Sequence, residues 1–425
     1  MLIEFNVSNY RSISSPQSLS LAASKGNELA DTNTCSLNTS PQLSVLRSAA
    51  LYGANASGKS NVLKALDTMK TIVVDSAKDY QRGDKLPVDP FLFDVETREA
   101  PSEFEVTFIE DGVRYQYGFA ATKERIKEEW LLAFPKGRAQ RWFERHWDEK
   151  ANEYVWDMGG NFHGEKQLWQ KATRGNALFL STAVQLNSEN LEPIYDWFRF
   201  KLRVTDVSAW SNSFSTKLCL TDAKKPILEF LKAADLDIED INIEKDKFDI
   251  NALPDEIPEE VKKFLSEDME GKTIYEVKTL HKTLNGELVT LDLKEESDGT
   301  QKLFSLAGPW IDTLKNGYIV FIDELHDNLH PRLVKFLVSL FHSNETNPNN
   351  AQLVFSTHET SILNQDTFRR DQVWFCEKDD SQSTTLFPLT DFSPKKGREN
   401  LEAAYLAGRY GALPYVKELK IEYGN

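Results

Sequence analysis

Cysteine is scarce in this sequence. The three cysteines, Cys35, Cys219 and Cys376, lie far apart in the chain and include no C-x-x-C pair. So few and so widely spaced thiols exclude a disulfide framework, and they lack the spacing of a zinc site. We therefore interpret them as reduced thiols and expect a cytoplasmic location.

Long hydrophobic runs and heptad repeats are absent as well. No apolar stretch reaches the roughly 18 residues that span a bilayer, and the N-terminus does not show the charged and then apolar pattern of a signal peptide. We therefore expect no membrane segment. The missing heptads exclude a long coiled-coil arm. At 425 residues, of which 40% are hydrophobic, the chain has room for two or three domains or for one large domain with insertions.

Basic residues are fewer than acidic residues in this sequence. The sequence has 50 lysines and arginines against 66 aspartates and glutamates, a formal net charge of −16. A surface of this sign gives no general attraction to nucleic acid, whose binding depends on neutralised phosphates. A local exception is the stretch 123–145, where seven basic residues alternate with aromatic ones, the composition of a single-strand platform. Four glutamates dilute it, so a solvated region of strands and turns is the alternative that we favour.

The clearest chemical motif is the stretch 53–60, G-A-N-A-S-G-K-S, which follows the G-x-x-x-x-G-K-S pattern of a phosphate loop. Its glycines let the backbone curl, so that successive N–H groups point at anionic oxygens. Lys59 is suited to bind the β- and γ-phosphates, and the Ser60 hydroxyl is suited to bind Mg²⁺. The nucleotide-binding residues predicted in this stretch are Gly53, Asn55, Ala56, Ser57, Gly58, Lys59 and Ser60.

The flanks of this motif fit a phosphate loop. Residues 45–52 form an apolar run short enough for a buried strand, and apolar residues from Val62 to Val73 follow at helical spacing. A strand, a glycine-rich loop and a helix in this order are the context in which the motif binds a nucleotide. The positive end of the helix would also face the phosphates.

A second chemical stretch begins at Gly317 and ends at Asp323 and Glu324. Its five consecutive apolar residues predict a strand buried on both faces of a parallel sheet, and ligands bind beyond the carboxyl ends of such strands. Beside a phosphate loop, we expect Asp323 to hold Mg²⁺, usually through water, and Glu324 to polarise the water that attacks the γ-phosphate. Without the phosphate loop, an apolar run ending in two acids would indicate only a strand end.

Three further sites depend on their neighbours in the same way. His358 follows an apolar run and could bind the γ-phosphate or the attacking water, although a lone histidine is more often structural. Ser297 and Gly299 open an amphipathic helix and could form an anion site, although Ser297 by itself would be an N-cap. Arg11, after the strand predicted at 1–7, could reach the nucleotide or pair with an acid.

The rest of the pattern predicts alternating groups of strands and helices. Two hairpins are expected, each at a turn dipeptide, Asp111-Gly112 or Asn285-Gly286. The expected elements are hairpins at 103–119 and 274–293, a further strand pair within 125–158, and helices at 166–197, 222–234 and 256–264.

The order of these motifs resembles the ATPase head of the ABC superfamily: a phosphate loop, S-x-G at a helix start, an apolar run ending in Asp-Glu, and a strand-end histidine. The opening N-Y-R-S at 9–12 and the loop G-A-N-A-S-G-K-S-N, which adds Asn61 to the binding residues, resemble the branch of RecF-like, Rad50-like and SMC-like ATPases. The resemblance implies an α/β fold, an ABC-type P-loop ATPase head with a mixed sheet, plus an inserted α/β and helical lobe. The head would comprise residues 1–125 and 271–425, and the lobe residues 126–270, in which a short helical hairpin could occur.

The same resemblance implies ATP and Mg²⁺ as ligands and a homo-oligomer built from ATP-sandwich dimers. In this superfamily, the S-x-G of one subunit completes the ATP site of another, so Ser297 and Gly299 would act across a dimer. The resemblance also favours the nucleotide-contact role of Arg11.

Within that branch, S-D-G-T-Q-K at 297–302 and D-E-L-H-D-N-L-H-P at 323–331 are similar to stand-alone bacterial anti-phage ATPases. These are the RloA and AbiL type, the ATPase subunit AriA of the PARIS system, and the ATPase half of overcoming-lysogenisation-defect nucleases. They imply a switch ATPase that senses a phage protein and controls a separately encoded effector, such as a Toprim nuclease or another toxin. The residues after His358 are too few for a Toprim domain.

Two alternatives stay open beside the defence function. The first is a RecF-like DNA-repair ATPase that clamps duplex DNA as an ATP-dependent dimer, which the net charge disfavours. The second is a transport ATPase, which needs a membrane partner and which the N-terminal strand pattern disfavours.

Overall fold

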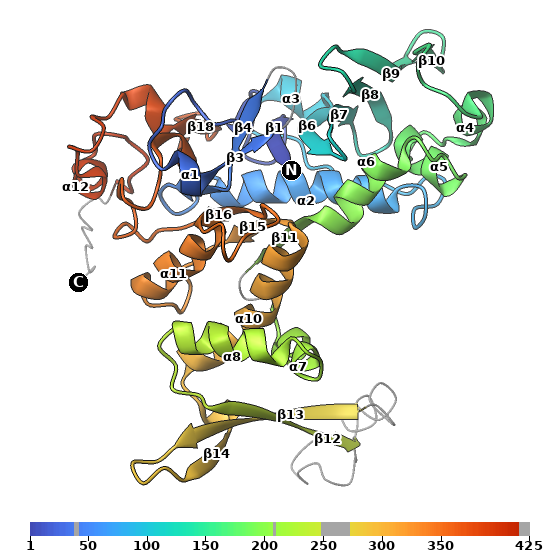
Figure 1. Cartoon of the computed structure of the whole chain (residues 1–425). Coiled ribbons are helices and arrows are strands. Elements are labelled where there is room, and N and C mark those ends of the chain that lie inside the picture. Colours follow the sequence, from blue (N-terminus) through green and yellow to red (C-terminus); the bar gives the residue numbers. More distant parts are fainter. Residues whose placement is uncertain (38–41, 207–209, 248–272, 416–425) are drawn as a thin grey trace, which may run out of the picture. The chain divides into compact units, whose positions relative to one another are not determined.

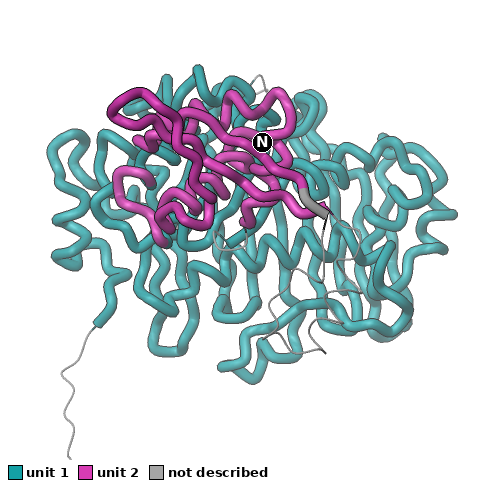
Figure 2. Tube along the Cα trace, turned by 90° about the horizontal axis from the view of Figure 1, so that it is seen from below, with its two compact units in different colours: residues 1–207, 314–327, 334–425 teal, residues 208–313, 328–333 magenta. Residues whose placement is uncertain are grey.

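The computed structural model describes residues 1–37, 42–206, 210–247 and 273–415, which divide into two compact units (Figure 2). Unit 1 comprises Met1–Val207, Leu314–Asp327 and Val334–Asn425, and unit 2 comprises Ser208–Thr313 and Asn328–Leu333. The helix expected at 256–264 lies outside the described residues. Within the described ranges, every helix is too short or too polar to cross a bilayer.

The first sheet of unit 1 has seven antiparallel strands in the order β10-β9-β8-β7-β6-β1-β2. Burial alternates along its strands, so that one face of the sheet forms a core. On β6, Phe104, Val106 and Phe108 are buried, and the residues between them are more exposed. Asp111 and Gly112 have φ of 49° and 74° and form the tight turn of the predicted hairpin, which is confirmed. The strands are β1 (Leu2–Ser8), β2 (Gln17–Ser20), β6 (Ser102–Glu110), β7 (Val113–Ala121), β8 (Ile126–Phe134), β9 (Gln140–Asp148) and β10 (Glu153–Met158).

The boundary between the units differs from the predicted domain ranges. Residues 126–158 hold three strands instead of one pair, and β8 bonds directly to β7. This continuous ladder satisfies the backbone groups of β7 that would otherwise form an open edge, so the stretch extends the first sheet and does not begin a separate lobe. Residues 273–313, which we predicted as part of the head, lie in unit 2.

A buried ion pair removes one basic residue, Arg145, from the nucleic-acid platform considered at 123–145. Glu129 on β8 and Arg145 on β9 have fully buried side chains, and Oε2 of Glu129 lies 2.8 Å from a terminal guanidinium nitrogen of Arg145. Glu129 also accepts the N–H groups of Phe179 and Leu180, the first residues of helix α5. Arg145 is therefore part of the core, and the charge of Glu129 lies at a positive helix end.

Three other basic residues of that stretch, Arg125, Lys127 and Arg141, also contact neighbouring side chains. Lys127 pairs with Glu149, and Arg141 lies 2.9 Å from both Glu144 and Asp157. The guanidinium of Arg125 lies over the ring of Trp147, 3.6 Å from its centroid. The favoured interpretation, a region of strands and turns with a solvated face, agrees with these contacts.

The second sheet of unit 1 has six strands in the order β11-β15-β16-β5-β17-β18. The first five are parallel, and β18 is antiparallel to β17, so the sheet is mixed, as expected. Every residue of β5 and β16 is buried, in keeping with the apolar runs read from the sequence. The strands are β5 (Ser48–Tyr52), β11 (Leu202–Asp206), β15 (Ile319–Asp323), β16 (Gln352–Ser356), β17 (Val373–Lys378) and β18 (Thr384–Pro388).

Helix α2 (Lys59–Asp75) lies between the two sheets of unit 1 (Figure 1). It contacts β1 and β6 of the first sheet and β11 and β15 of the second. The predicted apolar stripe forms this double contact, because Val62, Leu66, Met69 and Val73 are all buried. One continuous core joins α2 to both sheets, so the start of α2 is held firmly at the edge of the second sheet.

Shorter elements complete unit 1. Helices at 166–172, 179–185 and 192–196 confirm the helical character predicted for 166–197. These elements are α1 (Ala30–Asn33), β3 (Thr34–Leu37), β4 (Leu43–Leu46), α3 (Val95–Glu99), α4 (Lys166–Ala172), α5 (Phe179–Gln185), α6 (Glu192–Asp196), the π-helix η1 (Trp197–Lys201), η5 (Arg370–Gln372), η6 (Leu389–Phe392) and α12 (Leu401–Leu406). Helix α11 (Pro331–His342) begins in unit 2 and continues into unit 1.

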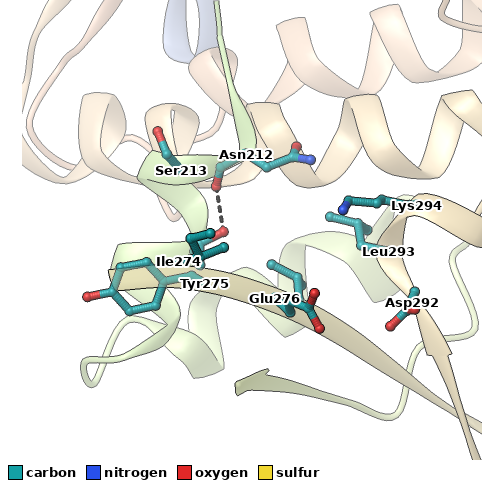
Figure 3. A pocket seen from close by; sticks show the side chains of 10 residues that line it. Asn212, Ser213, Ile274, Tyr275, Glu276, Asp292, Leu293 and Lys294 are labelled. Atoms are coloured by element: carbon teal, nitrogen blue, oxygen red, sulfur yellow. Dashed lines mark hydrogen bonds between the residues drawn. The ribbon is translucent and has the colours of Figure 1, made fainter. Parts of the chain in front are cut away.

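Unit 2 contains a three-stranded antiparallel sheet, β12-β13-β14, which contacts α7 and α8. Gly286, at φ 85°, lies in the turn of the predicted hairpin, which is confirmed. A pocket of about 270 Å³ lies between α7 and the start of β13, with Asn212 and Ser213 on one side and Tyr275 and Glu276 on the other (Figure 3). The elements are α7 (Asn212–Cys219), α8 (Lys224–Ala233), β12 (Asp240–Lys247), β13 (Thr273–Lys282), β14 (Leu288–Asp292), η4 (Leu293–Glu295) and α10 (Asp298–Asn316), which ends in unit 1.

Candidate functional site

The carboxyl ends of the parallel strands bring three predicted groups to one edge of the second sheet. The phosphate loop follows β5, Asp323 is the last residue of β15, and His358 lies two residues beyond β16. Around them lies a cavity of about 340 Å³ within unit 1. The residues that line it are Asn55, Ala56, Ser57, Gly58, Lys59, Ser60, Asn61, Glu324, His358 and Lys378.

The phosphate loop has the close backbone approach that its glycines predict. Gly58 is the N-cap of α2 at φ 108°, and a Cβ there would lie 2.1 Å from Oγ1 of Thr384. A Cβ on Gly53 would lie 2.4 Å from the carbonyl oxygen of Cys376. The Ser57 hydroxyl is buried without a hydrogen-bond partner, and the first N–H groups of α2 have no carbonyl one turn earlier to bind. This donor set fits a phosphate group.

Lys59 is engaged by the loop itself and by His358. Its Nζ donates to the carbonyl oxygens of Gly53 and Ala54 at 2.9 and 3.1 Å, and it lies 3.1 Å from Nε2 of His358. Burial lowers the pKa of Lys59, while nearby acidic groups, Asp323 among them, oppose this effect. The lysine is thus held at the cavity wall, with its charge directed at loop carbonyls.

Ser356 on β16 organises the two acids that follow β15. Its hydroxyl donates to Oδ1 of Asp323 and accepts the backbone N–H of Glu324 at 2.8 Å. Its carbonyl accepts the N–H of Leu325 at 3.1 Å. Glu324 adopts the left-handed region at φ 53°, a conformation that a non-glycine residue keeps only when its surroundings impose it. The result is an exposed Glu324 side chain at the cavity.

Two histidines meet beside these acids. The ring of His326 packs edge-on against that of His358, with 5.5 Å between centroids, and Nδ1 of His326 is buried without a partner. Burial, followed by the charge of Lys59, lowers the pKa of His358 to about 4. Burial also lowers the pKa of His326. His358 is therefore neutral at physiological pH and able to accept at one nitrogen and donate at the other.

The structure places Arg11 and Asn61 in supporting contacts. The Arg11 guanidinium lies 3.3 Å from Oδ2 of Asp89, so the acid-pairing alternative describes it, and Arg11 does not line the cavity. Asn61 donates to Oγ of Ser12 at 2.7 Å, and this hydroxyl lies 2.8 Å from Oγ1 of Thr384. The N-terminal segment around Ser12 is thereby tied to the start of α2.

Ser297 and Gly299 lie in unit 2, whereas the phosphate loop lies in unit 1. Oγ of Ser297 accepts the N–H of Thr300 at 3.2 Å, which is the N-cap contact of α10. The local interpretation of Ser297 as an N-cap therefore holds, and a role toward nucleotide belongs to the proposals below.

Three residues that support the site are not among those predicted from the sequence. Lys378 lines the cavity from the end of β17, Ser356 positions the acids, and Thr384 on β18 donates to the carbonyl of Ser57 at 2.9 Å. A signal for Lys378 does exist, because it follows the apolar run V-W-F-C of a parallel strand, as the predicted site residues do. Nothing in the sequence indicates the cross-strand contact of Thr384.

Residues 48–364, about three quarters of the chain, match the family described as "AAA domain, putative AbiEii toxin, Type IV TA system". The chain belongs to this family. Together with the mixed sheet, the phosphate loop and the polar strand ends, membership makes it an ABC-like P-loop ATPase of the AbiEii type, so the predicted fold class is confirmed. The family is ATPase-type. No curated protein matches the chain.

Among solved structures, the chain is similar to the SMC head domain from Thermotoga maritima, at 11% identity over 91% of this chain and 98% of that one, with a TM-score of 0.40. It is also similar to an SMC head bound to the C-winged helix domain of ScpA, at 11% identity over 91% and 97%, with a TM-score of 0.34. The protein cbiO1 from Clostridium perfringens, part of the ABC transporter complex cbiONQ, shares 10% identity over 53% and 68%, with a TM-score of 0.25.

Proposed function

We propose that this chain binds and hydrolyses ATP as the switch of a bacterial anti-phage defence system. The observation that supports this function best is the cavity in which the phosphate loop, Glu324 and His358 meet, with Asp323 beside them. A phosphate cradle, a carboxylate at a strand end and a neutral histidine are the groups that hydrolysis of a nucleoside triphosphate needs.

Each residue of the site has its own role in the proposed reaction. Lys59 and the loop N–H groups bind the β- and γ-phosphates, and Ser60 and Asp323 would hold Mg²⁺. Glu324 takes a proton from a water whose oxygen attacks the γ-phosphorus, while the bond from that phosphorus to the bridging oxygen breaks and ADP leaves. His358 orients the water or the γ-phosphate. Bound Mg²⁺ supplies charge neutralisation.

A metal held in this way needs few protein ligands. In the described ranges, no group of three or more histidine, cysteine, aspartate or glutamate residues is arranged to hold a metal ion. Mg²⁺ commonly keeps several waters and binds through one or two side chains plus phosphate oxygens, which fits Ser60 and Asp323.

We further propose that ATP joins two protomers. Ser297 and Gly299, at the start of α10, would reach the γ-phosphate bound by a second protomer, and hydrolysis would release the pair. Nucleotide is then the ligand that distinguishes the joined from the separated state. The N-cap contact of Ser297 supports a preformed helix start, whose free N–H groups suit an anion.

The defence role is supported by the family description, which names a toxin and a toxin–antitoxin system. Such systems pair two components. We assign this chain the sensing component, which responds to a phage protein and controls a separately encoded effector, such as a Toprim nuclease or another toxin. The net charge of −16 and the internal pairing of the basic stretch at 123–145 favour this over a clamp on duplex DNA.

A pull-down from the native host tests the proposal. Tagged Glu324→Gln protein is isolated with ATP before and after phage challenge, and bound material is identified by mass spectrometry and nucleic-acid staining. We expect a stoichiometric protein partner that is released on challenge and is absent from the Lys59→Ala variant. Duplex DNA without such a partner would overturn the switch and support a DNA-repair ATPase instead.

A further inference from the structure

Lys378 is a cation of the cavity that the proposed reaction leaves unused. It is half-buried at the end of β17 and, like Lys59, lines the cavity. Unlike Lys59, its side chain makes no hydrogen bond or ion pair with any residue that the structure describes. A lysine without a protein partner in a cavity shaped for phosphate is available to an anionic ligand.

The direction of Lys378 follows from the pleat of β17. Side chains alternate along a strand, so Lys378 shares a face with Cys376, whose buried thiol lies near enough to Lys59 for the charge of that lysine to oppose the rise that burial causes in the thiol pKa. Glu377 points to the other face, where a Cβ on Gly411 would lie 2.9 Å from its Oε2. Lys378 thus faces the nucleotide cavity, and Glu377 faces the C-terminal segment.

The position of Lys378 relative to the phosphate loop is fixed by its cross-strand neighbour. Lys378 is in register with Thr384 on β18. Oγ1 of Thr384 donates to the carbonyl of Ser57, and its N–H donates to the carbonyl of Ser12 at 2.7 Å. The hairpin of β17 and β18 is therefore attached to the loop, and Lys378 is carried by a rigid element.

The order of the strands in the second sheet indicates which phosphates of the nucleotide Lys378 would contact. Glu324 follows β15 and His358 follows β16, which lie on one side of β5, whereas β17 lies on the other side. The spacing between neighbouring strands is about 4.8 Å, so the ends of β16 and β17 are about 10 Å apart. We propose that Lys378 binds the inner, α- and β-phosphates of the nucleotide, while the residues after β15 and β16 act on the γ-phosphate. This inference rests on the proposed ATPase function.

Binding of ATP and of ADP by the full chain tests the assignment. Dissociation constants of both, with Mg²⁺, are measured by calorimetry for wild type, Lys378→Gln and Lys378→Arg. A lost charge-assisted contact weakens binding by about ten- to a hundredfold. We expect this loss for ATP and ADP alike in Lys378→Gln and near-complete rescue in Lys378→Arg. Glu377→Gln, the neighbour on the opposite face, is the matched control and keeps wild-type affinity.

Two results would overturn the inference. If Lys378→Gln weakens binding of ATP but not of ADP, Lys378 acts at the γ-phosphate; if neither affinity changes, it does not bind the nucleotide. Lys378→Met is measured in parallel and decides the question if the first variant fails to fold. Failure of the ATPase function itself looks different, because wild type would then bind neither ATP nor ADP.

Discussion

Nζ of Lys59 lies 3.1 Å from Nε2 of His358. An ammonium group only donates, so Nε2 of His358 is the acceptor and the proton of its neutral ring is on Nδ1. Burial lowers the pKa of both groups, which keeps His358 in this neutral form. Without nucleotide, the two residues therefore satisfy each other. We expect a bound γ-phosphate to separate them, with Lys59 turning to phosphate oxygens and Nε2 of His358 becoming available to the γ-phosphate or the attacking water.

Lys59→Ala should abolish nucleotide binding. The substitution removes the cation that would face the β- and γ-phosphates and leaves the loop carbonyls of Gly53 and Ala54 without their donor. We expect the dissociation constant for ATP to rise by about a hundredfold or more. Calorimetry measures it, with Lys64→Ala, an exposed lysine of the same helix, as the control. Normal ATP affinity in Lys59→Ala would contradict the phosphate-loop assignment.

Glu324→Gln should separate binding from hydrolysis. Glutamine keeps the shape of the side chain and the backbone contact to Ser356, but it cannot take a proton from water. We expect ATP affinity near that of wild type, turnover lower by about 10²- to 10⁴-fold, and an ATP-dependent dimer or higher oligomer. Phosphate release and light scattering measure the two effects. Wild-type turnover would show that Glu324 is not the catalytic residue, and Glu345→Gln, an exposed acid, controls for charge.

Sequence patterns revealed the parts of the site that follow apolar runs. The phosphate loop, Asp323 and His358 lie at or within two residues of the ends of strands whose buried residues are consecutive, so the pattern indicates both the strand and its end. The pairing of Glu129 with Arg145 could not be predicted in this way. It depends on the register of β8 and β9, and an exposed and a buried arginine look alike in a sequence.

The same limit applies to the boundaries of the units. Whether β8 continues the first sheet or starts a new lobe depends on which strand it bonds, and alternation shows only that it is a strand. Unit 2, for the same reason, takes up β13 and β14, although the motif that begins α10 resembles the head. The local sequence pattern predicts each helix or strand, whereas contacts between elements far apart in the sequence determine to which unit an element belongs.

Arg145→Met should destabilise unit 1 strongly. Glu129 would remain fully buried without its countercharge, although Tyr117, Phe179 and Leu180 would still donate to it. Removing one partner of a buried ion pair costs about 3–5 kcal/mol. Urea denaturation measures the loss. Arg141→Met, which breaks only half-exposed pairs, should cost less than about 1 kcal/mol.

A double variant distinguishes the buried charge from the lost packing of Arg145. Glu129→Gln combined with Arg145→Met leaves no uncompensated charge, so the free energy of unfolding should recover part of the loss. If the double variant is as unstable as the sum of the two single ones, Glu129 on β8 and Arg145 on β9 do not stabilise each other.

His342 should make the protein sensitive to mild acid. Its ring is buried at the end of α11, with Nε2 2.8 Å from Oγ of Ser48 and near the charge of Arg47, and burial lowers its pKa to about 3. An unfolded histidine titrates near 6.5, so between that pH and about 3 the unfolded chain binds a proton that the folded chain does not. The free energy of unfolding therefore falls as the pH falls, by about 2 kcal/mol at pH 5 from this group.

The test of this acid sensitivity compares slopes rather than absolute stabilities. His342→Gln keeps an acceptor for Ser48 but takes up no proton. The slope of the free energy of unfolding against pH between 6.5 and 5 should therefore decrease, by an amount that corresponds to at most one proton. Urea denaturation at several pH values measures the slope. His163→Gln, at an exposed histidine, should leave it unchanged. An equal slope in His342→Gln and wild type would show that His342 is protonated in the folded chain, and its burial would then have to be relieved by local opening of the end of α11.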